Sequence, residues 1–336
     1  MRHAVAVVAG GVLLAGHVLV AAPAAAVSAE RPESAACVSG THPDEPAGQA
    51  RSGSADVGRA ADGPAYTDVE RLRMERRLDQ RLDELGLEPT VPATSARAGA
   101  AARVGATLRI PVHAHVITRP GTRGTSKRKI LRQLRVLDAA YAGGQSPTNA
   151  VSRFDFYLAS LSRVRNSRWR TAVIGGREDL AMRRRLHRGG PEALNLYVSK
   201  PQSPGTGVVL GWATAPDKAR RQTVQDGVVV HQGSLPGGGL HGYNRGDTVV
   251  HEIGHWLGLY HTFEGGCEGP GDLVADTPAQ SEASTLCDPA KDSCLDQPGL
   301  DPVNNFMDYS VDDCMNMFTP EQVARMHDNW LAYRTP

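Results

Sequence analysis

Three histidines and one glutamate stand close together in the stretch HEIGHWLGLYH, residues 251–261. If residues 247–257 form a helix, His251 and His255 lie four positions apart on one face, so their imidazoles can hold one metal ion. Glu252 is turned by roughly 100° from His251, which places it beside the metal, where a general base for a water molecule belongs. Gly258 can take the left-handed conformation that ends a helix, and the chain can then return to present His261 as a third ligand.

The expected metal is zinc. Three neutral imidazoles with one open position are typical of catalytic zinc, which lowers the pKa of a bound water to about 7. Imidazole also suits copper, nickel and iron, but nothing in the sequence supplies a redox role. The alternative is a helix whose histidines merely fill a surface. A chance HExxHxxGxxH should occur in roughly 1 of 10,000 chains of this length, which favours the metal site.

The same pattern resembles the signature of the metzincin clan of zinc proteases. A methionine turn, NNFMDY, follows at residues 304–309. The surrounding sequence is similar to the pappalysin family and its bacterial ulilysin-like members. The matching pieces are HEIGHWLGLYHTF, GGC at 265–267, DLVADTP at 272–278 and NFMDYSVDDCMNMFTPEQVARM at 305–326. The resemblance covers roughly residues 105–336.

The resemblance implies a secreted zinc endopeptidase. Glu252 would take a proton from water and pass it to the leaving amine. Met307 would pack below the metal without binding it, and Tyr309 would stabilise the oxyanion. Residues 207–213 would be the antiparallel edge strand that binds an extended peptide by main-chain hydrogen bonds. A zinc hydrolase of non-peptide amides or esters and a catalytically silent binding module are the alternatives; the intact Glu252 argues against the silent module.

The resemblance also implies a specificity residue. Ulilysin-like enzymes carry an acid after the methionine turn and prefer arginine immediately after the cleaved bond. Asp312 stands at the matching place, and a shielded carboxylate can hold a guanidinium with two charge-assisted hydrogen bonds. The alternative is that Asp312, or its neighbour Asp313, is a solvated loop acid.

Four of the five cysteines follow His261: Cys267, Cys287, Cys294 and Cys314. An even set in a secreted, loop-rich segment predicts disulfides, although the sequence does not separate the three possible pairings. The resemblance implies Cys267–Cys294 and Cys287–Cys314. A structural zinc is the alternative, but no spacing is CxxC.

The loop with Asp272 and Asp276 is similar to a calcium-binding loop of ulilysin-like enzymes. Calcium at these two carboxylates and nearby carbonyls is therefore expected as a possible second cofactor. A solvated loop is the alternative for isolated acids.

The N-terminal third predicts a leader and a pro-region. Residues 1–29 have a basic start, an apolar run and small residues for cleavage, which indicates a signal peptide. Residues 30–104 are a loose pro-region and linker around one helix, 67–85, with a capping box at Thr67 and Glu70 and a stripe of Leu78, Leu82 and Leu85. An unstructured spacer without an inhibitory role is the alternative.

A cysteine switch and self-processing are two further expectations for this pro-region. The thiolate of Cys37 would occupy the open position of the metal, although a stray thiol is the alternative. Arg97 and Arg103 would allow self-processing before the catalytic domain, residues 105–336.

The elements that must position the site read as alternating strands and helices. Strands are expected at 107–118, 154–158, 194–199, 208–213 and 227–231, and helices at 126–142, 247–257 with Asp247 as N-cap, and 321–333. This predicts an α/β upper half with a mostly parallel twisted sheet, an antiparallel edge strand and a loop-rich, disulfide-stapled lower half. His113 and His115 share a strand face, where half-buried histidines are favoured over a second metal pair.

Bulk charge is balanced, with 37 Lys and Arg against 36 Asp and Glu. This gives no reason to expect nucleic acid or an acidic surface as partner. The Arg183–Arg188 cluster is better explained as a solvated helix face than as a nucleic-acid patch. We expect a monomer, free of the membrane once the leader is removed, whose partner is a peptide or protein substrate.

Overall fold

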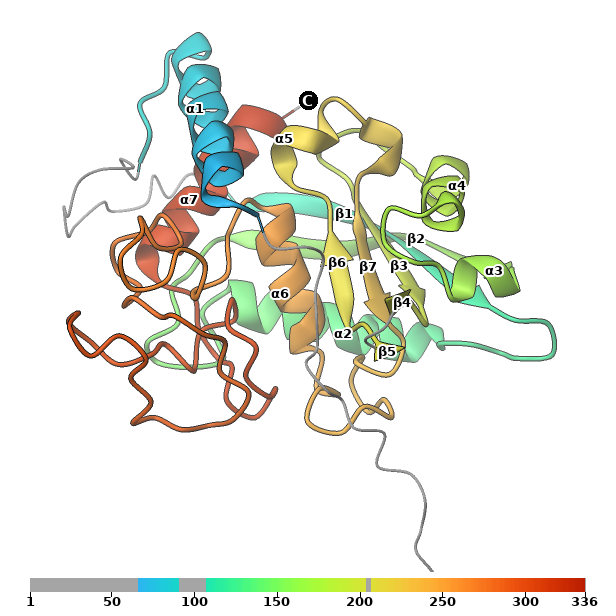
Figure 1. Ribbon diagram of the computed structural model, residues 1–336. Helices are drawn as coiled ribbons and strands as arrows, with labels where there is room; N and C mark the ends of the chain where they lie inside the picture. The colour runs from blue at the N-terminus through green and yellow to red at the C-terminus, as the bar shows by residue number, and fades with distance from the viewer. Residues whose placement is uncertain (1–65, 91–106, 204–206, 336) are drawn as a thin grey trace, which may run out of the picture. The chain divides into compact units, whose positions relative to one another are not determined.

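A five-stranded sheet forms the upper half of the protein in this computed structural model, which describes residues 66–90, 107–203 and 207–335 (Figure 1). The predicted signal peptide, most of the pro-region, Cys37, Arg97 and Arg103 lie outside the described residues. The strand order is β2-β1-β3-β7-β6. The bounds are β1 Leu108–Thr118, β2 Phe154–Arg165, β3 Leu194–Ser199, β7 Val228–His231 and β6 Gly211–Ala213.

The sheet has the predicted character. β1, β2, β3 and β7 are parallel, and β6 pairs antiparallel with β7 at one edge. β3 and β7 are buried at every position, which explains their mostly apolar sequence between two covered faces. The predicted mixed sheet with an antiparallel edge strand is confirmed.

The edge strand is shorter than predicted. Residues 207–213 were expected to form one strand, but β5 (Gly207–Val208) pairs with β4 (Gln202–Ser203) in a separate ribbon. Val209 and Leu210 are buried between β5 and β6. The backbone of Leu210 accepts a hydrogen bond from the His231 N–H at 2.7 Å, so pairing with the main sheet begins there.

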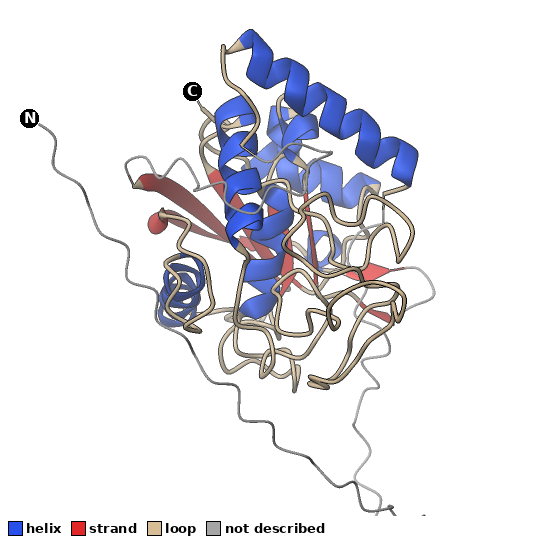
Figure 2. Cartoon of the chain, turned by 90° about the vertical axis from the view of Figure 1, so that its left-hand side faces the viewer, coloured by secondary structure: helices blue, strands red, loops and turns tan. Residues whose placement is uncertain are grey.

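Helices cover both faces of the sheet (Figures 1 and 2). The large core joins the sheet to α2, α6 and α7, while α3 and α4 contribute to a smaller cluster on the other face. The bounds are α2 Lys127–Tyr141, α3 Ser167–Arg170, α4 Arg177–Leu186, α5 Pro216–Ala219, η1 Thr223–Gln225, α6 Asp247–Trp256 and α7 Pro320–Tyr333. No helix among the described residues is long and apolar enough to cross a membrane.

Helix α1 (Asp68–Glu84) packs along α7 (Figure 1). Thr67 and Glu70 form the predicted capping box. Leu78 and Leu82 are buried against α7, whereas Leu85 is 42% exposed and lies past the end of the helix. The apolar stripe is therefore one residue shorter than expected, and two buried charges extend the contact.

These two charges are Arg71 and Glu75. Glu75 forms a bidentate, buried ion pair with Arg325 of α7, with one N–O distance of 2.8 Å. Arg71 donates to the backbone oxygen of Gly271 in the lower half. Helix α1 is thus held by charge-assisted hydrogen bonds as well as by leucines.

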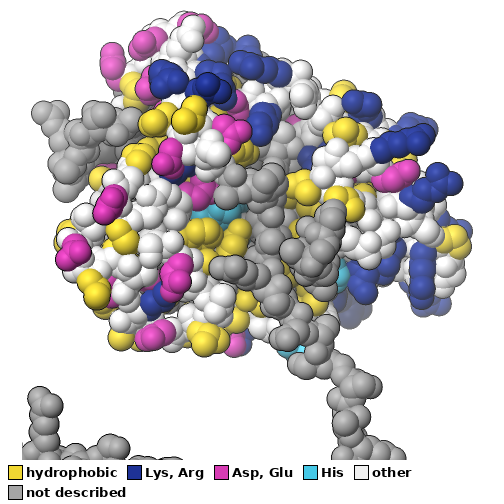
Figure 3. All heavy atoms as spheres, viewed as in Figure 1, with side chains coloured by type: hydrophobic (Ala, Val, Ile, Leu, Met, Phe, Trp, Pro, Cys, Tyr) yellow, Lys and Arg dark blue, Asp and Glu magenta, His cyan; other side chains and the backbone are white. Residues whose placement is uncertain are grey.

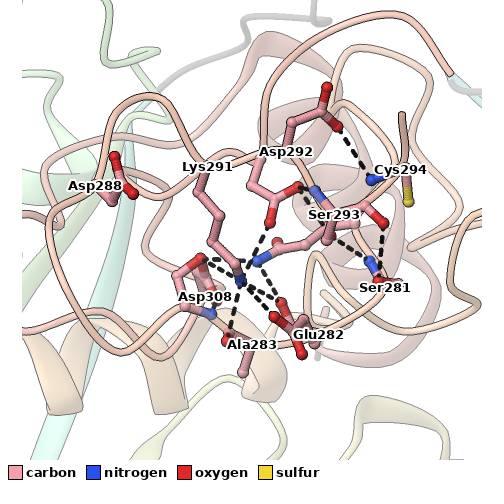
Figure 4. Close-up of polar contacts among 12 residues, drawn as sticks. Ser281, Glu282, Ala283, Asp288, Lys291, Asp292, Ser293, Cys294 and Asp308 are labelled. Carbon is pink, nitrogen blue, oxygen red and sulfur yellow. Dashed lines mark hydrogen bonds and ion pairs between the residues drawn. The ribbon is translucent and has the colours of Figure 1, made fainter. Parts of the chain in front are cut away.

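The lower half, between α6 and α7, is built of turns. The disulfides Cys267–Cys294 and Cys287–Cys314 staple it, each with a Cα–Cα distance of 5.4 Å. Lys291 lies at the centre of the turns shown in Figure 4, where its Nζ donates to the Glu282 and Ala283 carbonyls. The same Nζ pairs with Asp301 at 3.1 Å. A chain with little secondary structure is thus fixed by covalent and polar links.

Candidate metal centre

Helix α6 contains His251, Glu252 and His255, the first residues of the site. Gly246, with a φ of 111°, occupies the N-cap position, and Asp247 lies in the first turn. The prediction of Asp247 as N-cap was therefore wrong by one residue. The cap comes from elsewhere, because Asp312 Oδ2 accepts hydrogen bonds from the N–H groups of Arg245 and Gly246 at 2.7 and 3.1 Å.

The three predicted ligands converge. The Nε2 atoms of His251 and His261 lie 3.1 and 3.0 Å from Nε2 of His255. Two nitrogens on a tetrahedral zinc ion are about 3.3 Å apart when each zinc–nitrogen bond is ~2.05 Å. Among the described residues, these histidines form the one group of three or more His, Cys or acidic side chains with ligand atoms close enough for a metal.

The Nδ1 atom of each of these three histidines lies within hydrogen-bond distance of a protein oxygen. Nδ1 of His251 lies 2.6 Å from the Phe306 carbonyl, and Nδ1 of His255 lies 2.8 Å from the Leu259 carbonyl. Nδ1 of His261 lies 2.7 Å from Glu264 Oε1. Each Nδ1 must therefore carry the proton, which leaves three Nε2 lone pairs directed at one point. This donor set fits a divalent cation that favours imidazole.

Glu252 is buried beside the histidines and faces the edge strand. A Cβ at Gly211 of β6 would overlap the Glu252 carboxylate, so glycine is required for the strand to approach this closely. Glu252, the predicted general base, and the strand expected to hold substrate are thus in direct contact. The sequence contained Gly211 within the predicted edge strand but gave no sign of this role.

Two glycines of α6 and its end shape the rest of the site. A side chain at Gly254 would collide with the Met307 sulfur, which lies buried directly beneath the helix. Gly258 has a φ of 96° and ends the helix, as predicted. The chain then returns, so that His261 reaches the other two ligands.

Tyr309 lies beside the ligands, at the lower side of the site. Its ring centroid is 4.9 Å from that of His261 and 5.8 Å from that of His251. Phe263 stacks on His261 with centroids 4.8 Å apart, and its ring centroid also lies 4.9 Å from that of Tyr309. The half-buried ring of Tyr309 is therefore placed at the metal site rather than in the core.

Glu264 was missed by the sequence analysis. It is buried, its Oε1 meets His261 Nδ1, and its other oxygen lies 3.8 Å from Arg71 of α1. Burial raises the pKa of Glu264, but the hydrogen bond with His261 and attraction to Arg71 help to lower the pKa below its ordinary value. Its spacing of three from His261 was the available signal, but a loop position gives no fixed direction to a side chain.

The space around the ligands has two parts. One cavity is lined by Trp212 and Thr214 at the edge strand and by Glu252 and His255. Tyr66, which precedes α1, and Met74 of α1 also line it. A smaller pocket opens beside Tyr309, and Leu210, Tyr243, Thr248 and Met315 contribute to its lining.

Asp312 is not among the lining residues of either space, but burial and then the charge of Asp312 raise the pKa of Tyr243, which lines the smaller pocket. Only 4% of it is exposed, and it caps α6 as described above. Asp313 is exposed and pairs with the Arg245 guanidinium. One oxygen of Asp312 is thus committed to the end of α6, and its role as a substrate-pocket acid stays a prediction.

The other candidate ligands have protein partners. Asp272 is buried and accepts from Thr277 Oγ1 at 2.7 Å, and burial raises its pKa to about 7. Asp276 accepts from the Glu321 N–H at 2.8 Å. On β1, His113 contacts Ser160, and His115 contacts Ser162 and Asn195. The strand histidines are thus satisfied by neighbours, the arrangement that the sequence analysis favoured.

Comparison with known proteins agrees with this geometry. A family model described as pregnancy-associated plasma protein-A, peptidase M43, matches residues 192–331. An extracellular metalloprotease of Pyricularia oryzae is 39% identical over 260 residues, which span 76% of this chain and 87% of that protein. Another extracellular metalloprotease, from Neurospora crassa, is 42% identical over 235 residues, which span 68% of this chain and 77% of that protein. The chain belongs to the pappalysin family.

Solved structures of this family show the same fold. Mature mirolysin of Tannerella forsythia, in complex with a cleaved peptide, has a TM-score of 0.57 at 28% identity and covers 66% of this chain and 91% of that one. Promirolysin has a TM-score of 0.60 at 25% identity, with 80% and 96% covered. This pappalysin is an extracellular metalloendopeptidase.

Proposed function

We propose that this pappalysin cleaves peptide bonds with zinc on His251, His255 and His261 and with Glu252 as general base. The observation that carries the proposal is the convergence of three Nε2 atoms beside a buried glutamate that faces the edge strand. Zinc, when bound, would polarise the scissile carbonyl and lower the pKa of a water molecule.

The residues of the chain divide the remaining work. A substrate peptide pairs with β6 by main-chain hydrogen bonds, which fixes its carbonyl near the ligands. Glu252 takes a proton from the attacking water and returns it to the leaving nitrogen. The Tyr309 hydroxyl donates a hydrogen bond to the developing oxyanion. Burial of Glu252 excludes bulk water from the proton transfer.

The test is Glu252→Gln, with the exposed Glu282→Gln as matched control. A neutral amide cannot accept the proton, so the first variant should bind zinc fully and lose nearly all turnover of a quenched peptide. The control should match wild type. Turnover above a few per cent in a zinc-loaded Glu252→Gln protein would show that Glu252 is not the base.

A panel of peptide, ester and amide substrates separates peptidase activity from the alternatives. Chelator-sensitive cleavage of peptides supports the proposal, and cleavage of small esters alone would favour a non-peptide hydrolase. The absence of any hydrolysis by the zinc-loaded protein, once its pro-region is removed, would favour a binding module.

For the residue after the cleaved bond, we propose an uncharged, apolar preference. The pocket beside Tyr309 is lined by Leu210 and Met315, while Asp312 faces the backbone of α6. The arginine preference built on Asp312 is the competing prediction. Met315→Asp should introduce a basic preference in a cleavage-site profile, and Asp312→Ala should not alter the profile. A wild-type preference for arginine would contradict this assignment.

We further propose that α1 belongs to a pro-region that restricts the active site. Tyr66 and Met74 share a cavity with Glu252 and His255, and the Tyr66 ring lies 6.1 Å from that of Tyr260. The likeness to promirolysin over 80% of the chain supports this reading. The switch role of Cys37 remains a separate prediction, and a Cys37→Ala zymogen as latent as wild type would contradict it.

Calcium at the Asp272 turn is also a proposal. A buried carboxylate with a raised pKa is ionised more easily when a cation binds to it. Added calcium should raise the melting temperature of wild type but not of Asp272→Asn. Equal shifts in both proteins would count against the site.

A further inference from the structure

Positive charge is concentrated in one part of the chain, although the whole chain is nearly neutral. Residues 107–190 contain eighteen Lys and Arg and four Asp and Glu, a net charge of +14. Residues 262–336 contain three Lys and Arg and fourteen Asp and Glu, a net charge of −11. In Figure 3, Lys and Arg gather on the right-hand side, where α3 and α4 lie in the matching view of Figure 1. Overall balance therefore hides a strongly basic surface.

The centre of this surface is a depression between the β1–α2 loop and the end of β2. Arg123, Arg163 and Arg165 line it, together with the hydroxyl-bearing Thr122 and Ser126, and no acid contributes to the lining. The register places Arg165 opposite Thr118, so the β2 arginines lie next to the start of the loop. Cationic and hydroxyl groups thus surround one recess.

The basic surface continues from the recess onto α3. The pKa of Arg170 is lowered by partial burial and then by repulsion from Arg119, which places these two cations near each other. We call the whole set the basic face: Arg119, Arg123, Arg163, Arg165, Arg168 and Arg170.

Among the described residues, the positive charge of the basic face is not neutralised by ion pairs with acidic side chains, because no carboxylate lies within ion-pair distance of its arginines. The adjoining first turn of α2 carries Lys127, Arg128 and Lys129 and no acid. Cations at a helix N-terminus oppose the helix dipole, so this arrangement costs stability that an external anion would restore.

We propose that the basic face binds a sulfated or phosphorylated polysaccharide. Arginine forks match sulfate and phosphate oxygens, and the Thr122 and Ser126 hydroxyls can bond sugar hydroxyls. The recess lining has no aromatic side chain to stack on bases, as single-stranded nucleic acid requires, and no exposed apolar side chain to insert into lipid. An extracellular enzyme would thereby be held on an anionic matrix.

The experiment measures binding of the full-length chain to dextran sulfate, dextran phosphate and neutral dextran over a range of salt concentrations. Arg163→Glu/Arg165→Glu is compared with Arg220→Glu/Arg221→Glu, which makes the same charge change at exposed residues beyond α5. We expect binding to one or both charged polymers and none to neutral dextran. The first variant should bind roughly tenfold or more weakly, with a salt slope lower by about two, and the control less than about threefold.

The two charged dextrans identify which anion is preferred. If both double variants lost the same binding affinity for the charged dextrans, the basic face would not be the binding site. Binding would then depend only on the net charge of the chain. Tighter binding to duplex DNA or to anionic phospholipid vesicles of matched charge would overturn the polysaccharide assignment. Thermal melting of each variant shows that the fold is kept, and the result does not depend on peptidase activity.

Discussion

Leu82→Ala tests whether α1 is a detachable pro-region or a fixed part of the enzyme. Leu82 is fully buried, but among the described residues its small apolar cluster contains only Leu78, Ala332 and Tyr333 as other buried members, with the partly buried Leu87 packed against it. Truncation of a buried leucine costs about 2–5 kcal/mol, and a small cluster near the surface favours the lower part, about 2.5 kcal/mol. A destabilisation of that size raises the fraction of undocked α1 by roughly 60-fold.

The assay follows release of α1 by the rate of limited proteolysis between residues 91 and 106 and by cleavage of a quenched peptide. Both rates should rise in Leu82→Ala, while the melting temperature of the rest of the protein stays the same. Leu85→Ala is the matched control, because its side chain is 42% exposed and its loss should change stability by at most about 0.5 kcal/mol. If Leu82→Ala lowers the global melting temperature without faster release, α1 is part of the enzyme core and the latency proposal fails.

Two further predictions concern buried carboxyl groups. Burial, and then the nearby Asp312, raises the pKa of Asp247 to about 8, far above its unfolded value of about 3.9. The folded state therefore binds the proton more tightly, and this contribution to stability should be lost as pH rises from about 4 through 8. Asp247→Asn should flatten the pH dependence of the melting temperature, and parallel curves would contradict the assignment. Glu264→Gln should weaken zinc binding about 10–100-fold in a chelator competition, because it orients His261. The exposed Glu268→Gln is the control, and equal affinities in the two variants would contradict the role.

Several features were predicted from sequence because they depend on residues close together in the chain. The four-residue spacing of His251 and His255, the capping box of α1 and the turn at Gly258 are set by helix geometry. Alternating strand and helix patterns gave the class of the sheet. The disulfide pairing and the methionine turn came from family resemblance, since spacing alone does not select them.

Other features depend on residues that are far apart in sequence. Asp312 was predicted as a pocket acid because it follows the methionine turn, and only the fold shows that it also caps α6 from 66 residues away. The uncapped N-terminus of a buried helix needs an acceptor, and the loop that passes it supplies one. The concentration of arginines at the basic face likewise arises where β2 ends beside the β1–α2 loop.

The sequence by itself predicted the metal ligands and the general base and indicated the family, because a helix converts spacing directly into direction. The tertiary structure decided which groups support those residues: Gly211 against Glu252, Glu264 on His261 and Asp312 under α6. These contacts join strands, loops and helix ends whose relative positions follow from packing of the whole core, and no local pattern encodes them.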